Sequence, residues 1–211
     1  EERRANPTDD LTSKLVHNQL PEDLLTPAEI TSLFVLLAVA GNDTTRTAIS
    51  HGVNLLSKNP DQRAIWQADV DGVTQTAVEE IVRVASPVTF MRRTATGDVT
   101  LAGEQVHEGD KFVMFYGAAN RDPRVFDDPE RFDVRRSPNP HVGFGGPGPH
   151  FCLGANLARR EVAVVFRELF KRLPDLEVTG PAVPLDTAGL PLVGGIKRLP
   201  VRFTPTAPSG G

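Results

Sequence analysis

The sequence has little sulfur and no excess of charge of either sign. Its 211 residues include one cysteine, which excludes an internal disulfide framework and a zinc site built from several cysteines. Lys and Arg number 23 and Asp and Glu number 27, for a net charge of -4. This balance argues against a nucleic acid as partner and against a polybasic membrane arm. The longest apolar run, Leu33–Ala40, is far shorter than the roughly 20 residues that cross a bilayer, so we expect no membrane span in this chain.

The chain also lacks an initiating Met and a signal-peptide pattern, and it begins with the charged stretch EERRANPTDD. A sequence that starts inside a charged stretch is typical of a fragment, so we expect a preceding part to be missing. What is present, with 39% hydrophobic residues, is enough for a sizeable core.

Helical patterns dominate the first half of the chain. We predict a long helix over 27–58, because Thr26 and Glu29 form a capping box at its start and an Asn-Pro pair follows its end. Its segment Leu33–Ala40 is apolar on every side, which predicts burial all round. Two shorter helices follow. One carries Trp66, and the other, which we expect Thr74 to cap, stops at a Ser-Pro pair.

The second half changes character. Alternating apolar residues and Gly-containing turns predict short strands between Val88 and Met114. A last strong helix is predicted over about 153–173. It carries two adjacent apolar rows, the first of Leu153, Leu157, Val165, Leu169 and Leu173 and the second of Val162, Phe166 and Phe170. Together these patterns predict a mainly α fold with small β-sheets.

The only cysteine, Cys152, lies in the glycine-rich loop GFGGPGPHFCLG, directly before the last helix. Glycines let a backbone approach another group closely, prolines stiffen the loop, and a helix N-terminus favours a thiolate over a thiol. A rigid loop that presents one thiolate suits a large flat metal cofactor. Two other interpretations remain open: a buried, inert cysteine in a turn, and a phosphate-binding loop, although no GxxxxGK[ST] or GxGxxG motif is present.

The middle of the long helix contains Gly41-Asn42-Asp43-Thr44-Thr45, all poor helix formers. A carboxylate beside a hydroxyl at a helix bulge can relay protons to a bound oxygen species. Burial of Asp43 costs free energy unless it is paired or hydrogen-bonded. A capped kink with a satisfied Asp43 is the alternative interpretation.

Other charged residues have both structural and functional interpretations. Glu80 and Arg83 can pair on one helix face, either as an exposed i, i+3 pair or as a buried pair that ties the helix to the following loops. Arg93, His141 and His150 are donors that can clamp the carboxylates of a cofactor. Taken singly, each of the three also fits an ordinary surface side chain.

In this order, the motifs resemble the C-terminal half of a cytochrome P-450, a haem-thiolate monooxygenase. The resemblance covers nearly the whole chain and rests on AGNDTT, on Glu80-x-x-Arg83, on the PERF sequence at 129–132, and on the cysteine loop with LGANLARRE. It implies that 1–211 is the C-terminal haem-binding portion of a single domain whose N-terminal half is absent. Within it, 27–58 would be the long oxygen-activation helix and 141–173 the cysteine-ligand loop with its following helix.

The resemblance also implies residue roles. Cys152 would be the axial ligand of the iron of haem b. Asp43 and Thr44 would deliver protons, and Gly41 would leave room for dioxygen. Glu80 and Arg83 would form a structural pair, with Arg131 or a neighbour as third partner. The remaining assignments are haem propionate contacts at Arg93, His141 and His150, further cofactor contacts at Phe144 and Gly154, and a substrate pocket lined by Leu36, Ala40, Val88, Phe90, Met91 and Leu192.

Phe144 departs from the usual pattern of the family, since it stands one position farther from the cysteine than is typical. Most similar are soluble actinobacterial enzymes that hydroxylate fatty, methyl-branched or sterol side chains. The resemblance therefore implies a cytoplasmic monooxygenase that inserts one oxygen atom of O2 into an apolar substrate, with electrons from NAD(P)H through a ferredoxin reductase and a ferredoxin. The basic residues Arg159, Arg160 and Lys171 resemble a docking face for an acidic ferredoxin, or form a plain solvated face. A non-catalytic haem binder or sensor and an inactive truncated fragment are the alternatives.

Overall fold

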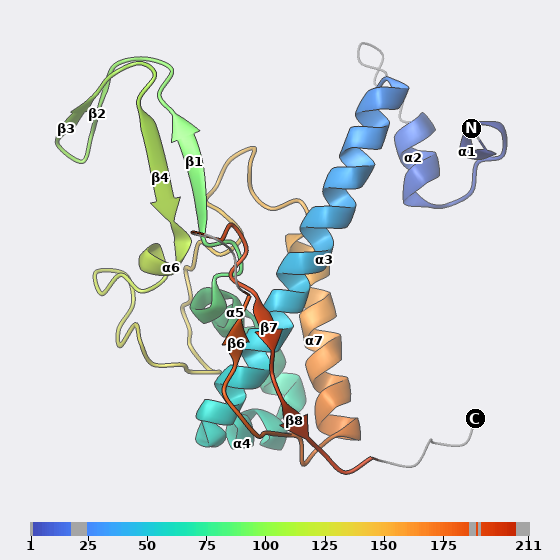
Figure 1. Cartoon of the computed structure of the whole chain (residues 1–211), viewed down its shortest axis with the longest axis vertical. Coiled ribbons are helices and arrows are strands. Elements are labelled where there is room, and N and C mark those ends of the chain that lie inside the picture. Colours follow the sequence, from blue (N-terminus) through green and yellow to red (C-terminus); the bar gives the residue numbers. More distant parts are fainter. Residues whose placement is uncertain (1, 18–24, 186–188, 190, 206–211) are drawn as a thin grey trace. The chain divides into compact units, whose positions relative to one another are not determined.

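The structure is a computed structural model that describes residues 2–17, 25–185, 189 and 191–205. The chain divides into two compact units, Glu1–Asn42 and Asp43–Gly211, which we describe separately. The first unit contains α1 (Glu2–Ala5), α2 (Leu11–His17) and the N-terminal part of α3, a helix that runs over Pro27–Lys58 and continues into the second unit (Figure 1).

A capping box starts α3, as the sequence predicts. The backbone N–H of Thr26 donates to the Glu29 carboxylate at 2.7 Å, and the N–H of Glu29 donates to the Thr26 hydroxyl at 3.3 Å. The helix then continues through Gly41–Thr45 without interruption. The prediction that Leu33–Ala40 is buried all round is wrong for this chain. Phe34, Val35, Leu36 and Val39 are each more than half exposed, because neither α1 nor α2 makes an extensive contact with this part of α3.

The second unit adds the helices α4 (Pro60–Ala68), α5 (Val70–Ala85), α6 (Tyr116–Ala119) and α7 (Ala155–Arg172). The cap of α5 differs from the prediction. Asp69, not Thr74, caps it by accepting the N–H of Gly72 at 2.9 Å. Thr74 lies one turn later, where its hydroxyl accepts the indole N–H of Trp66 at 3.0 Å and donates to the Val70 carbonyl at 2.5 Å.

Trp66 is the centre of the core of this unit. Its side chain is fully buried, with ring centroids 5.0 Å from Phe166 and 5.1 Å from Phe170. α5 packs against α7, and the two helices share a cluster of buried apolar residues with α4 and the second part of α3 (Figure 1). On α7 the buried row is the one with Val162 and Phe166, whereas Leu153, just before the helix, is 83% exposed.

The strands of the described residues form four antiparallel pairs and no larger sheet. They are β1 (Phe90–Thr94) with β4 (Lys111–Phe115), β2 (Val99–Leu101) with β3 (Glu104–Val106), β5 (Glu177–Val178) with β8 (Val201–Arg202), and β6 (Val183–Pro184) with β7 (Ile196–Arg198). The predicted fold class, mainly α with small β-sheets, is confirmed. Among the helices that the structure describes, none combines the length and the apolar character needed to span a membrane.

Candidate functional site

The cysteine loop ends at the N-terminus of α7 and exposes its thiol. Cys152 is exposed, its N–H donates to the Phe144 carbonyl at 2.9 Å, and its own carbonyl accepts from the N–H of Ala155 at 3.2 Å. Gly145 turns the chain with φ 91°, a left-handed conformation that favours glycine. The hydrogen bond between Cys152 and Phe144 therefore closes the loop on itself, while Cys152 stays exposed. The interpretation of Cys152 as a buried, inert thiol does not fit this arrangement.

A cluster of charged side chains supports the same loop. The Glu79 carboxylate accepts hydrogen bonds from Nε of Arg159 at 2.5 Å and from Nη2 at 3.1 Å, and it pairs with Nε2 of His141 at 2.7 Å. The Arg159 guanidinium carbon lies 4.4 Å from the centre of the Phe144 ring. Burial raises the pKa of the Glu79 carboxyl, but the hydrogen bonds from His141 and Arg159 outweigh burial and lower this pKa to about 2.

Beside this cluster on α5, Glu80 and Arg83 form a pair with no exposed side-chain surface. Arg83 donates to both carboxylate oxygens of Glu80, at 2.7 and 2.8 Å, and its two terminal nitrogens also reach the carbonyls of Asn120, Pro129 and Arg131. Glu80 accepts further bonds from Arg136 at 3.2 Å and Asn139 at 3.1 Å.

These contacts exclude the interpretation of an exposed i, i+3 pair. The third charged partner is Arg136, a neighbour of Arg131, while Arg131 contributes its backbone carbonyl. One buried polar atom of this region has no hydrogen-bond partner, the amide oxygen of Asn139. The pair thus ties α5 to the segment that leads into the cysteine loop, as the second interpretation of the sequence proposes.

The acid and hydroxyl of the long helix lie at the start of the second unit. The Asp43 side chain is 54% exposed and pairs with Arg46 at 2.8 Å, and Thr44 is partly buried. Asp43 is therefore not buried here, the helix is unbroken around it, and the expected cost of its burial does not arise. Gly41 lies in the first unit, where a Cβ at its position would meet no atom within 4 Å.

The remaining predicted site residues are distributed as follows. Arg93 is exposed on β1, where it donates to the carbonyl of Arg92 at 3.0 Å, and His150 and Gly154 are exposed in the cysteine loop. His141, by contrast, has only 3% of its side chain exposed and uses both ring nitrogens within the chain, with Glu79 and with the N–H of Gly143. The structure thus gives His141 partners other than the predicted cofactor carboxylate.

The structure brings part of the predicted substrate pocket together. Val88 forms a bridge to Val193, and the N–H of Thr89 donates to the Leu192 carbonyl at 2.9 Å, so the segments around Val88 and Leu192 are adjacent. Phe90 and Met91 follow on β1, with Phe90 half-buried and Met91 36% exposed. The other two predicted lining residues, Leu36 and Ala40, lie in the first unit and are exposed.

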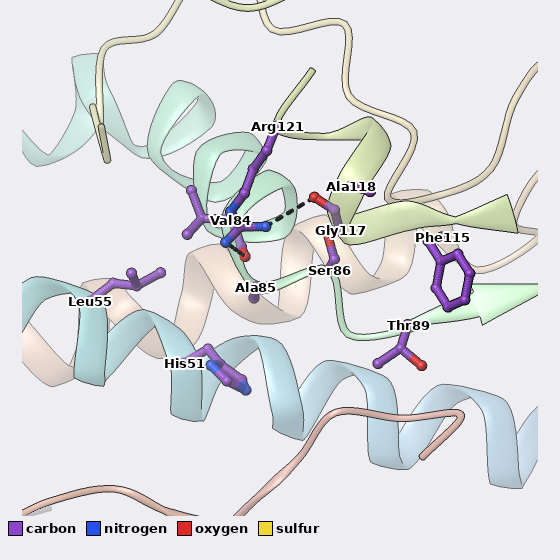
Figure 2. A pocket seen from close by; sticks show the side chains of 10 residues that line it. All are labelled: His51, Leu55, Val84, Ala85, Ser86, Thr89, Phe115, Gly117, Ala118 and Arg121. Carbon is purple, nitrogen blue, oxygen red and sulfur yellow. Dashed lines mark hydrogen bonds between the residues drawn. The ribbon is translucent and has the colours of Figure 1, made fainter. Parts of the chain in front are cut away.

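A cavity of about 520 Å³ lies next to these segments (Figure 2). His51 of α3, the end of α5, and the residues around α6 line it, and Arg121 donates across one side to the carbonyls of Val84 at 2.8 Å and Gly117 at 3.2 Å. Its lining residues are His51, Leu55, Val84, Ala85, Ser86, Thr89, Phe115, Gly117, Ala118 and Arg121. Of the segments predicted to line the substrate pocket, the one around Val88 and Phe90 contributes to the cavity through Thr89.

The sequence analysis does not predict the ion pair of Glu79 and Arg159, which supports the cysteine loop. The contact between them joins positions 80 residues apart, and no short motif marks it. The sequence offers one signal, the two adjacent acids Glu79 and Glu80. Adjacent residues of a helix point in different directions, so Glu79 needs a partner other than that of Glu80.

The comparisons with known proteins agree with this geometry. The family model of cytochrome P450 matches residues 1–181. The chain belongs to the cytochrome P450 family. Among its relatives, the methyl-branched lipid omega-hydroxylase of Mycobacterium tuberculosis is 53% identical over 97% of this chain and 47% of the relative. The steroid C26-monooxygenase of Mycolicibacterium smegmatis is 44% identical over 97% and 46%. The chain thus spans about half the length of the curated relatives it matches.

Solved structures give the same result for the fold. A Mycobacterium marinum cytochrome P450 in complex with pseudoionone is 50% identical, with a TM-score of 0.89 over 96% of this chain and 48% of the other. A Bacillus megaterium cytochrome P450 in complex with testosterone is 35% identical, with a TM-score of 0.89 over 96% and 55%. The fold of this P450 chain is therefore that of about half of such a domain.

Haem b is the cofactor of this family, and the residues of this chain fit it. In the described part of the chain, no group of three or more His, Cys, Asp or Glu side chains could hold a bare metal ion. The donor set is instead one exposed thiol on a closed loop, which suits a metal that brings its own remaining ligands. A Cβ at Gly146, Gly148 or Gly154 would meet no atom within 4 Å, so the loop has open space at these three positions.

Proposed function

We propose that this P450 is a haem-dependent monooxygenase that inserts one oxygen atom of O2 into an apolar substrate, a fatty acid, a methyl-branched lipid or a steroid. The proposal depends on one observation: Cys152 is exposed on a loop that its N–H closes by a hydrogen bond to the Phe144 carbonyl, directly before α7. Cysteine thiolate is the haem ligand of this family, and it pushes electron density toward cleavage of the O–O bond. When bound, the haem supplies the oxygen chemistry, and the protein supplies binding, orientation and protons.

In this proposal the chain's own residues have three tasks. Cys152 binds the iron through its sulfur. Asp43 and Thr44 hold and move protons toward the reacting oxygen, and the exposure of the Asp43 carboxylate gives it contact with solvent protons. Glu80 and Arg83 hold α5 and the following loops in place, so that the cysteine loop has a fixed base.

The carboxylates of the haem need cationic or hydrogen-bonding partners. Arg93 and His150 are exposed and suit this role, whereas His141 is committed to Glu79 and Gly143. We therefore place the haem propionates against Arg93 and His150. Phe144 and Gly154 of the cysteine loop would also contact the cofactor.

The apolar substrate class has two supports. The named relatives act on methyl-branched lipids and steroids. The predicted lining residues of this chain, including Val88, Phe90 and Leu192, are uncharged, so hydrophobic contact would hold and orient the substrate. Electrons would come from NAD(P)H through a ferredoxin reductase and a ferredoxin, and we propose a cytoplasmic location.

The test uses the protein expressed from its complete gene and loaded with haem. The wild type should give the red-shifted band of the reduced carbonyl complex and should hydroxylate a fatty acid or a steroid with a ferredoxin system. Cys152→Ser should lose the band, and Cys152→His should retain haem without it, because imidazole replaces thiolate. A retained band in either variant would refute the ligand assignment. A wild type that binds haem without turnover would instead favour the non-catalytic binder or sensor, and one that does not bind haem the inactive fragment.

A further inference from the structure

Glu79 is an acidic residue of α5 that the proposed mechanism does not use, yet it contacts two groups that touch the cysteine loop. Its carboxylate is engaged by three nitrogen atoms, two from Arg159 and one from His141, at 2.5 to 3.1 Å. The Glu79 side chain is 22% exposed and that of His141 3%. This is a mostly buried ionic cluster, and such clusters cost free energy to assemble unless every group is paired.

His141 joins Glu79 to the start of the loop. Its Nδ1 accepts a hydrogen bond from the N–H of Gly143 at 3.1 Å, so Nδ1 carries no proton and Nε2 donates its proton to Glu79. Gly143 itself packs tightly, since a Cβ at this position would lie 2.6 Å from Cγ1 of Val82 on α5. The first residues of the loop are therefore held to α5 from both sides.

Arg159 links Glu79 to Phe144 and, through the Phe144 carbonyl, to Cys152 near the end of the loop. Its guanidinium lies over the Phe144 ring, and the carbonyl of Phe144 accepts the N–H of Cys152 at 2.9 Å. The two hydrogen bonds to Glu79 fix the plane of the guanidinium above the ring. A continuous series of contacts thus runs from Glu79 through Arg159 and Phe144 to the backbone of Cys152.

We infer that Glu79 is a positioning residue for the cysteine ligand, acting through His141 on Gly143 and through Arg159 on Phe144. The expected effect of Glu79 on the bound haem rests on the proposed function, whereas its effect on the conformation of the cysteine loop does not. Because hydrogen bonds from His141 and Arg159 lower the pKa of Glu79 to about 2 against the effect of burial, the carboxylate keeps its charge at neutral pH.

The first measurement follows the backbone of the loop by amide hydrogen exchange in the protein expressed from its complete gene. Glu79→Gln removes the charge and retains the shape of the side chain. We expect exchange at the Cys152 amide to become roughly tenfold faster, because loss of the charged partner loosens the contacts that hold the Phe144 carbonyl against this amide. Exchange along the β1–β4 pair should stay as in the wild type. Glu161→Gln, a change of an exposed residue on α7, is the matched control and should alter neither.

The second measurement follows the ligand itself. In the haem-loaded Glu79→Gln protein, we expect a smaller fraction of the reduced carbonyl complex to show the red-shifted band and a shift in the reduction potential of the haem. A purely structural role would lower thermal stability and leave both signals of the folded protein as in the wild type. Arg159→Lys is the second variant, since it keeps the charge beside Glu79 but loses the planar group over Phe144.

The outcomes separate this inference from the proposed function. If the wild type lacks the red-shifted band and exchange at Cys152 is faster in the two variants than in the wild type, the proposed function is overturned and the positioning role is supported. A wild type with the band, together with unchanged Cys152 exchange in both folded variants, would overturn the inference and leave the function intact. If Glu79→Gln does not fold, Arg159→Lys decides, because wild-type exchange in that variant would contradict the positioning of the loop through Phe144.

Discussion

Arg83 donates to both carboxylate oxygens of Glu80, and neither side chain has any surface exposed to solvent. Because removal of one partner of a buried ion pair leaves the other charged and unpaired, such a change costs about 3 to 5 kcal/mol. Arg83 also serves three backbone carbonyls of the loops. The pair is thus a structural centre of this P450 fold and not a surface feature.

We predict that Arg83→Lys lowers the free energy of unfolding by about 3 kcal/mol or more, because the lysine ammonium cannot replace the bidentate bond and the three carbonyl contacts at once. Urea unfolding of the protein measures the change. Arg202→Lys is the matched control, because its pair with Glu177 lies on the surface with 74% of the arginine side chain exposed. Equal midpoints for the wild type and Arg83→Lys would contradict the structural role.

The chain offers a matched pair of glycines on α3. A Cβ at Gly52 would lie 2.6 Å from Cζ of Phe166 and 2.8 Å from Cδ1 of Ile81, both buried, whereas a Cβ at Gly41 would meet nothing within 4 Å. Gly52→Ala should therefore destabilise the protein by about 1 kcal/mol or more, since overpacking outweighs the gain in helix propensity. Gly41→Ala should stabilise it by about 0.5 to 1 kcal/mol. Thermal unfolding of the two variants checks the sign, and a more stable Gly52→Ala would show that the helix contact can relax.

Acid should destabilise the protein in part through Glu79. The folded pKa of about 2 lies below the usual 4.5, so the ionised carboxylate contributes stability above pH 4.5, and this contribution is lost as the pH falls toward 2. Since each unit of difference in pKa corresponds to about 1.4 kcal/mol, the effect is measurable. Over this range, Glu79→Gln should show a flatter dependence of unfolding free energy on pH than the wild type. Parallel curves for the two proteins would mean that Glu79 is not paired in solution.

Replacement of Thr44 by alanine tests the proton delivery that we propose. With substrate and a ferredoxin system, NAD(P)H and O2 should still be consumed, while product per electron falls by about tenfold or more and hydrogen peroxide accumulates. The measurement compares product with peroxide at equal NAD(P)H oxidation. Thr31→Ala, on the exposed part of the same helix, is the control. Unchanged coupling in Thr44→Ala would count against a proton-transfer role for the hydroxyl.

Local signals predicted those parts of the fold that depend on neighbouring residues. The capping box of Thr26 and Glu29, and the helix that it starts, need only residues within one turn. The cap of α5 was predicted at the wrong residue, because Thr74 and Asp69 are both good caps and the choice depends on Trp66, whose indole occupies the threonine hydroxyl. The choice between two possible capping residues therefore depends on tertiary contacts that the local sequence does not contain.

Burial and long-range pairing were the harder parts. The spacing of Glu80 and Arg83 is the same for an exposed pair and a buried one, and only the surrounding loops decide between them. His141 is predicted as a haem propionate contact because it matches such a contact in the family that the motifs resemble. The partner that it has within the chain, Glu79, lies 62 positions away, and such a pairing is set by the fold and not by any local pattern.

The pairing of strands in twos has a further consequence. Each strand of the described sheets keeps one edge without a neighbouring strand, and on the β1–β4 pair these edges lie among the exposed side chains of Val113, Met114 and Phe115. Open edges beside apolar side chains are templates for strand addition, and hence for aggregation. In concentrated solution this ribbon therefore offers one surface for self-association, beside the exposed apolar side chains of α3.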